Sequence, residues 1–165
     1  MSKYELAVQM DIDQKLEAAA NAYEEIIKEA DAPLDSFINL ACLYWVSSQP
    51  GSSARGEFYT RAGEQMYAVL DEAQERFGKQ PEIVFWRLYF NQITLGEPTF
   101  LDQALDLVDQ PNSSPIVYFY IYAEGNDDYI PFVRRLYEDA QALKTTKNRY
   151  ILSFLDSPSF DWKEK

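Results

Sequence analysis

The sequence predicts an all-α protein, and three observations support this fold class. Glycines, prolines and short polar runs divide the 165 residues into segments of about 10 to 25 residues, a length typical of helices. Apolar residues within these segments recur at the i, i+3, i+4 and i+7 positions of amphipathic helices. Only residues 116–122, which are all β-branched or aromatic, would suit a buried strand, and no second run of this kind exists to pair with them. We therefore expect a helix there too, with a strand as the alternative.

Three helices are expected in the first half of the chain, over 15–30, 34–46 and 57–77. The first carries an apolar stripe of helical spacing, made of Leu16, Ala19, Ala20, Tyr23, Ile26, Ile27 and Ala30. Pro33 lies near the first turn of the second helix, where proline is favoured. Gly78 follows the third helix and is suited to end it. Residues 47–56, SSQPGSSARG, are expected to form a flexible linker.

Five further helices are expected in the second half, over 81–95, 98–109, 116–124, 128–143 and 145–156. Pro81 and Pro115 stand at the start of two of them, and Gly96 ends the first. Residues 157–165 are expected to form a polar tail that contains Trp162.

Some spacings in the chain are those of a helical repeat. Residues 18–45 form a helix–turn–helix pattern with meshed small and large apolar residues, and Pro81 and Pro115 are 34 residues apart. A bulky residue followed by leucine three positions later occurs twice, as Phe37 with Leu40 and as Phe85 with Leu88. These features resemble tetratricopeptide repeats, whose period is about 34 residues. The resemblance covers 15–46 best, then 81–110.

Two features depart from that repeat. Pro33 and Pro81 are 48 residues apart, so the second unit needs an insertion, which the 47–56 linker and the long helix could supply. The position after the leucine holds the small Ala41 in one unit but the bulky Tyr89 in another. The resemblance implies one domain over 1–165, with antiparallel helix pairs stacked as a tetratricopeptide-like (TPR-like) α-solenoid of three to four units. A generic α-helical bundle is the competing fold.

In the family, the first helix of each unit lines a concave groove that binds another protein. The resemblance therefore implies that apolar side chains just past the packing positions line such a groove, namely Ile38, Trp45, Trp86, Phe90 and Tyr120. Acidic residues near these helices would form a negative rim, namely Glu82, Glu97, Glu124, Asp127 and Asp128. The alternative is that the aromatic residues belong to the core and that the acids only stabilise helix N-termini.

Negative charge is concentrated in the first part of the chain. The net charge is −12, and residues 1–128 hold 22 acids and 8 bases, whereas 129–165 hold 5 acids and 7 bases. Such a field repels nucleic acids and acidic lipid surfaces and attracts a basic protein. We expect a basic protein partner, such as a toxin or a secreted protein, and no nucleic-acid or membrane partner. A solvated surface that only keeps the protein in solution is the alternative.

The residue types exclude most catalytic chemistry. The chain has no histidine and one cysteine, Cys42, so Ser-His-Asp and Cys-His catalysis and nearly all zinc sites are excluded. No phosphate-binding glycine motif occurs. We expect no cofactor and no metal. The first residues, MSKYELAVQMDIDQ, lack a signal-peptide pattern, and no apolar stretch is long enough for a membrane helix, so we expect a cytoplasmic protein.

The leading hypothesis is a non-enzymatic module whose acidic, aromatic-lined groove captures a basic protein, as an immunity or antitoxin-like inhibitor would. A TPR-type chaperone or adaptor for a secreted or assembled protein is the alternative. A homo-oligomer in which the aromatic stripes mediate self-association, and a hydrolase that uses paired carboxylates, are further alternatives.

Overall fold

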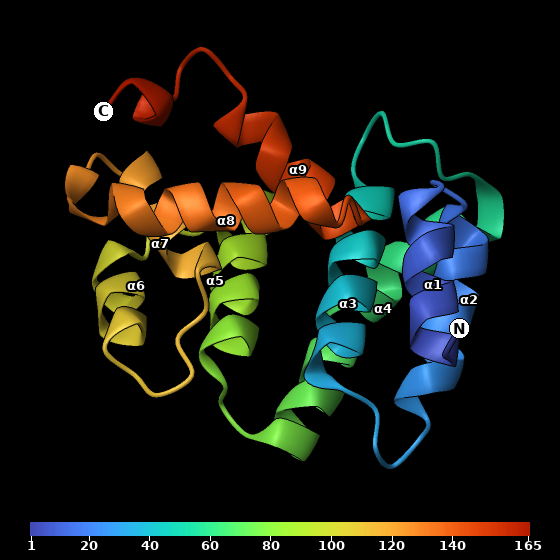
Figure 1. Ribbon diagram of the computed structural model, residues 1–165. Helices are drawn as coiled ribbons and strands as arrows, with labels where there is room; N and C mark the ends of the chain where they lie inside the picture. The colour runs from blue at the N-terminus through green and yellow to red at the C-terminus, as the bar shows by residue number, and fades with distance from the viewer. The chain divides into compact units, whose positions relative to one another are not determined.

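The computed structural model describes residues 1–165 and contains α- and 3₁₀-helices without strands (Figure 1). The all-α prediction is confirmed, and residues 116–122 lie within a helix. The contacts of the chain group into two compact units, where we expected one repeat domain over 1–165. Unit 1 contains residues 1–78 and 143–150, and unit 2 contains residues 79–142 and 151–165.

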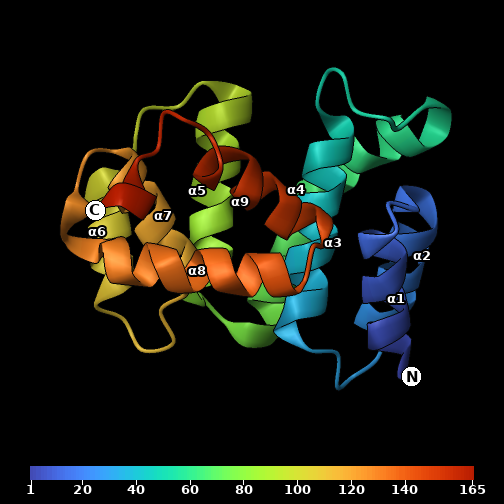
Figure 2. The same ribbon diagram turned by 45° about the horizontal axis from the view of Figure 1, so that its top comes forward.

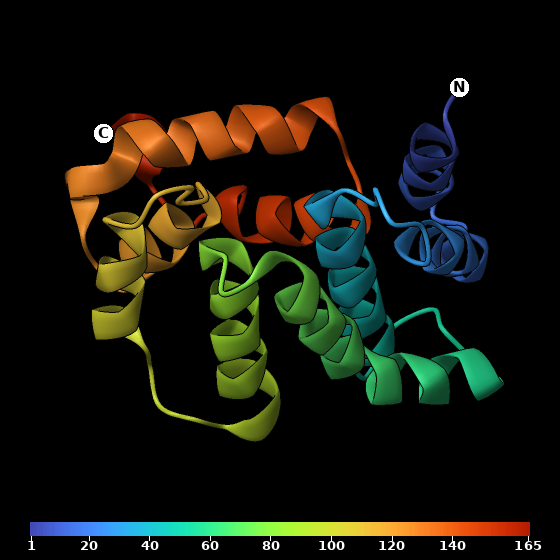
Figure 3. The ribbon, with the colours of Figure 1, turned by 90° about the horizontal axis from the view of Figure 1, so that it is seen from below.

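Four antiparallel helices build most of unit 1. They are α1 (Lys3–Ile12), α2 (Leu16–Ile27), α3 (Leu34–Ser48) and α4 (Gly56–Phe77). Each packs against the next one in the chain (Figure 1, Figure 3). Because α3 lies between α2 and α4, it is buried on nearly every side from Ser36 to Trp45. The small Ala19 and Ala20 of α2 are fully buried and allow close helix packing.

Helix α1 was missing from the expected helices, although its start is encoded in the sequence. The Ser2 hydroxyl accepts a hydrogen bond from the Glu5 backbone N–H at 3.1 Å, and the Glu5 carboxylate accepts one from the Ser2 backbone N–H at 2.6 Å. This is a capping box, which a serine and a glutamate three residues apart indicate.

Residues 49–55, within the expected linker, form a hydrogen-bonded turn. The Ser52 hydroxyl donates to the Ser47 carbonyl oxygen at 2.6 Å, and the Arg55 guanidinium donates to the Ser52 carbonyl oxygen at 2.6 Å. The first of these bonds satisfies a carbonyl oxygen that the end of α3 leaves unpaired, and the second satisfies a carbonyl oxygen of the turn itself.

The buried carboxylate of Asp11, in α1, completes unit 1 by capping α9 (Thr146–Leu155). Asp11 Oδ1 accepts hydrogen bonds from the Thr146 backbone N–H at 2.8 Å and from the Thr146 hydroxyl. Asp11 Oδ2 accepts one from the Tyr23 hydroxyl at 3.3 Å. The Arg149 guanidinium lies 3.7 Å from Oδ1 and donates to the Asp11 carbonyl oxygen at 3.1 Å. Asp11 thus acts as an N-cap supplied by a distant helix.

The environment of Asp11 makes the stability of unit 1 depend on pH. Burial raises the pKa of this carboxyl above its ordinary value of 3.8, although Thr146 and Arg149 act in the opposite direction. Because the folded state then holds the proton more tightly than the unfolded state, the free energy of unfolding falls as pH rises from 3.8 through the raised pKa. We expect the stability of the wild type relative to Asp11→Asn to fall over that interval. Urea unfolding of both proteins at several pH values measures this difference, and a difference that rises with pH would contradict the expectation.

Unit 2 is arranged around helix α7. Its elements are α5 (Pro81–Leu95), α6 (Leu101–Val108), α7 (Ile116–Ala123), the 3₁₀-helix η1 (Asp127–Tyr129), α8 (Ile130–Ala142), the end of α9 and the 3₁₀-helix η2 (Trp162–Glu164). Helix α7 contacts α5, α6, η1 and α8 (Figure 1, Figure 2). It is apolar on every face, and six of its eight residues are buried because neighbours cover most of its sides, which also explains its resemblance to a buried strand.

Residues 157–165 are packed within unit 2, although we expected a polar tail. Trp162 is 3% exposed, and its indole Nε1–H donates to the Leu155 carbonyl oxygen at 3.0 Å. The Arg134 guanidinium lies over the Trp162 ring, 5.6 Å from its centroid. A large aromatic side chain with a satisfied donor anchors this segment.

Candidate functional site

The five side chains predicted to line a groove are buried, so that part of the prediction is wrong. Ile38, Trp45, Trp86, Phe90 and Tyr120 are between 0% and 3% exposed. Ile38 and Trp45 belong to unit 1, where α3 lies between two helices, and the Trp45 ring packs edge-on against Tyr150 at 4.9 Å. The alternative interpretation, that these residues form core, describes their environment.

Trp86, Phe90 and Tyr120 belong to an aromatic core in unit 2. The Trp86 ring lies 5.3 Å from Phe85 and 5.7 Å from Phe90. The Tyr120 ring stacks on Phe100 with centroids 4.0 Å apart. The Tyr120 hydroxyl donates to Gln92 Oε1 at 2.6 Å and accepts from the Phe100 backbone N–H at 3.1 Å. This polar tip is satisfied inside the protein, so it is not a free anchor for a partner.

The five acids of the predicted rim all lie in unit 2, and four of them are exposed. Glu97, Glu124, Asp127 and Asp128 are exposed, whereas Glu82 is partly buried and accepts from the Trp86 indole N–H at 3.4 Å. Because Ile38 and Trp45 are in unit 1, the ten predicted residues do not form one site within either unit.

The segment from 88 to 133 is acidic and has no base of its own. It contains no lysine or arginine, and all its acids are exposed, namely Glu97, Asp102, Asp106, Asp109, Glu124, Asp127 and Asp128. Asp127 pairs with Lys165, and none of the other six has an ion pair. Unpaired carboxylates that remain hydrated create a negative potential without a desolvation cost.

This segment also contains a group of aromatic side chains, of which Phe132 is exposed and Tyr118 and Tyr129 are half-buried. Phe132, which is 43% exposed, stacks on Tyr118 with ring centroids 4.2 Å apart, and Tyr129 lies 5.2 Å from Tyr118. Asp127 and Asp128 precede Tyr129 in η1. We call these five residues, Tyr118, Tyr129, Phe132, Asp127 and Asp128, the aromatic–acidic face. The next bases along the chain are Arg134, which is held against Trp162, and Arg135, which is exposed.

Sequence reasoning missed the aromatic members of this face. The inward stripe of α8 is Ile130, Val133, Leu136 and Ala140. Phe132 lies off that stripe, and an aromatic residue on the outer side of an amphipathic helix was the signal that could have identified it. Tyr118 had no such signal, because every residue of α7 is apolar or aromatic.

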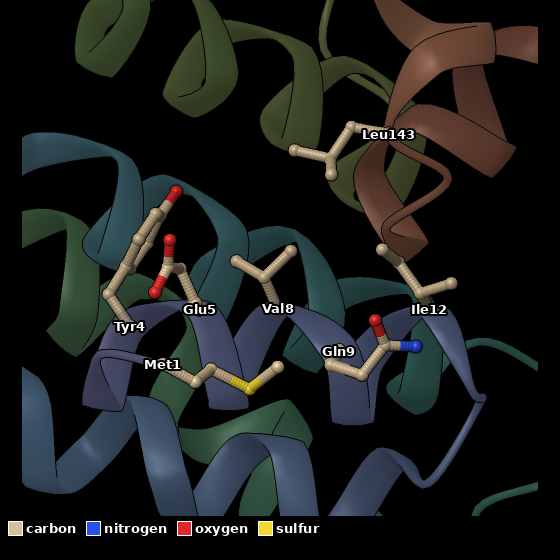
Figure 4. Close-up of a pocket in the computed structure, with 7 residues that line it drawn as sticks. All are labelled: Met1, Tyr4, Glu5, Val8, Gln9, Ile12 and Leu143. Carbon is tan, nitrogen blue, oxygen red and sulfur yellow. The ribbon is translucent and has the colours of Figure 1, made fainter.

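A second surface feature is an open apolar pocket of about 510 Å³ in unit 1. Its lining residues are Met1, Tyr4, Glu5, Val8, Gln9, Ile12 and Leu143. Figure 4 shows Leu143 across from Val8 and Ile12 of α1. The pocket has one carboxylate, which caps α1, and therefore lacks a pair of acids for hydrolytic chemistry.

No group of three or more Cys, Asp or Glu side chains is placed to hold a metal ion. None of the helices combines the length and apolar character needed to cross a membrane. The chain matches no protein-family model, and comparisons with curated proteins and with solved structures found no significant match.

Proposed function

We propose that the protein is a non-enzymatic binding module that captures a basic protein at the aromatic–acidic face. The observation that carries the proposal is the stack of the exposed Phe132 on the half-buried Tyr118, in a segment with no base from 88 to 133. Tyr129, which follows Asp127 and Asp128 in η1, lies against both rings. Aromatic rings supply contact area and attract cations to their faces, and the carboxylates attract lysine and arginine. In this proposal the aromatic–acidic face makes the main contacts with the partner, in place of the five buried side chains predicted from the sequence.

An immunity or antitoxin-like inhibitor is the specific role that we favour. Such an inhibitor covers the cationic surface of one toxin, and a negative charge concentrated in one segment suits that task better than an evenly spread one. Steering by charge would make association fast at low ionic strength and slower at high ionic strength.

A chaperone or adaptor role is the second candidate, and the apolar pocket along α1 is the observation that favours it. An open groove of about 510 Å³ suits an extended or helical segment of a client protein. Substitution of Leu143, which is 42% exposed, would then weaken binding, while Phe132 would be dispensable.

Capture from an extract of the native host, with elution by rising salt and identification by mass, tests the proposal. Phe132→Ala is expected to weaken binding of the captured basic protein about tenfold, because it removes a central aromatic contact. Asp128→Asn is expected to weaken it about fivefold and to reduce the salt dependence.

Matched controls lie in unit 1. Tyr59 is 40% exposed, close to the value for Phe132, and Glu64 is an exposed carboxylate without an ion pair. Tyr59→Ala and Glu64→Gln should leave the affinity unchanged. Equal losses in both pairs of variants, or affinity that is insensitive to salt, would contradict the proposal.

A further inference from the structure

The side chain of Lys165 occupies a small cation-binding site in unit 2. Its ammonium group lies 2.9 Å from Asp127 Oδ2, 3.1 Å from Asp161 Oδ1 and 5.8 Å from the centroid of the Tyr122 ring. Hydrogen bonds to Asp127 and then Asp161 raise the pKa of Lys165, so the group is fully charged at neutral pH. Two carboxylates and one aromatic face thus surround a single ammonium group.

Two of the three residues around this ammonium group, Tyr122 and Asp161, are held by contacts other than those of Lys165. The Tyr122 hydroxyl donates to Asp161 Oδ1 at 2.9 Å, which fixes that carboxylate. Tyr122 itself is 6% exposed, and its ring packs against Phe160 at 5.9 Å. Asp127 is held in η1, which also contains Asp128 and Tyr129 of the aromatic–acidic face. Without Lys165, two carboxylates would remain close together with no counter-ion.

We infer that Tyr122, Asp127 and Asp161 form a lysine-binding subsite of the partner-binding surface, which Lys165 occupies until a lysine of the basic partner displaces it. This inference rests on the proposed function. The subsite is continuous with the aromatic–acidic face because Asp127 belongs to both. Its two carboxylate oxygens come from different segments and converge on one point, which suits a compact ammonium better than a planar guanidinium.

The ion pairs that Lys165 makes with Asp127 and Asp161 are weak enough to permit this exchange. The side chains of Lys165, Asp127 and Asp161 are 38%, 53% and 56% exposed. Ion pairs with this exposure contribute little to stability, so competition by Lys165 lowers the affinity for a partner by no more than about fivefold. Competition by Lys165 therefore disfavours ligands that have only one positive charge and bind weakly.

Lys163 provides a matched control. It pairs with one carboxylate, that of Asp156 at 2.8 Å, and lies over the Tyr137 ring at 4.5 Å. Lys163→Gln and Lys165→Gln change the net charge equally and are two residues apart. Only Lys165→Gln leaves Asp127 and Asp161 together without a cation.

Calorimetric titration with an acetylated and amidated tetralysine peptide at low ionic strength tests the inference. Lys165→Gln is expected to bind the peptide about two- to fivefold more tightly than Lys163→Gln. Adding Asp161→Asn to Lys165→Gln should remove this gain. A tetra-arginine peptide should show a smaller gain.

The possible failures are distinct. Equal affinities of Lys165→Gln and Lys163→Gln, in proteins whose affinity still depends on Phe132 and Asp128, would overturn the subsite and leave the proposed function standing. Absence of peptide binding by every variant would overturn both.

Discussion

Replacement of Asp11 by alanine is expected to destabilise unit 1 by about 3 kcal/mol, because it removes the acceptor of several buried donors. The backbone N–H and the hydroxyl of Thr146 would lose their shared partner, Asp11 Oδ1. Tyr23 and Arg149 would lose the same carboxylate. Buried donors without an acceptor carry a desolvation cost that no new contact offsets. Urea unfolding followed by circular dichroism measures the loss of stability.

Asparagine at the same position provides the control. Asp11→Asn keeps an oxygen that accepts from Thr146, removes the charge and replaces the second oxygen with an NH2 donor, to which the Tyr23 hydroxyl can act as acceptor. We therefore expect a loss of less than about 1 kcal/mol at neutral pH. Hydrogen exchange should locate the weakening caused by Asp11→Ala at the start of α9 and at the end of α1. Equal stabilities of the alanine and asparagine variants would refute the cap.

Replacement of Trp86 by alanine is expected to destabilise unit 2 by about 4 kcal/mol. The side chain is 1% exposed, and its ring contacts Phe85, Tyr89 and Phe90. Truncation would leave a cavity between these rings, which the rigid aromatic neighbours cannot fill by small shifts. Thermal and urea unfolding should both show the loss.

The Trp86→Ala variant also tests whether Trp86 is a core residue or a groove residue. A tryptophan in an open groove would affect binding and leave the unfolding transition nearly unchanged. Phe132→Ala is the comparison, because Phe132 is exposed and should contribute only about 1 kcal/mol through its stack on Tyr118. A Trp86→Ala protein as stable as the wild type would contradict the core assignment.

The helices could be predicted because their signals are local. Periodicity located α2, α3 and α4, and Gly78 and Gly96, which end α4 and α5, have the positive φ angles of 75° and 69° that glycine tolerates. Helix α1 was not predicted, although Ser2 and Glu5 are spaced as a capping box. Its apolar stripe is too short to give a clear helical periodicity. The identity of α7 as a helix followed from the lack of any strand to pair with it.

The candidate site could be predicted only in part, because exposure of an aromatic residue depends on distant segments. Trp86 and Phe90 are one turn apart on a helix with apolar residues on several faces, and sequence alone does not say which faces are covered. Asp127 and Asp128 were found from charge, which is visible in the sequence. The capping role of Asp11 could not be predicted from the sequence, because it depends on a contact with Thr146, which is 135 residues away.

The split composition of unit 1 affects how the chain folds during synthesis. The first 78 residues emerge from the ribosome well before residues 143–150, which complete the same unit. Until Thr146 has been synthesised, the Asp11 carboxylate lacks the donors that it binds in the folded protein, so it must stay hydrated or protonated. Unit 1 therefore cannot be completed until almost the whole polypeptide has been synthesised. Contacts between residues so far apart in the sequence slow folding.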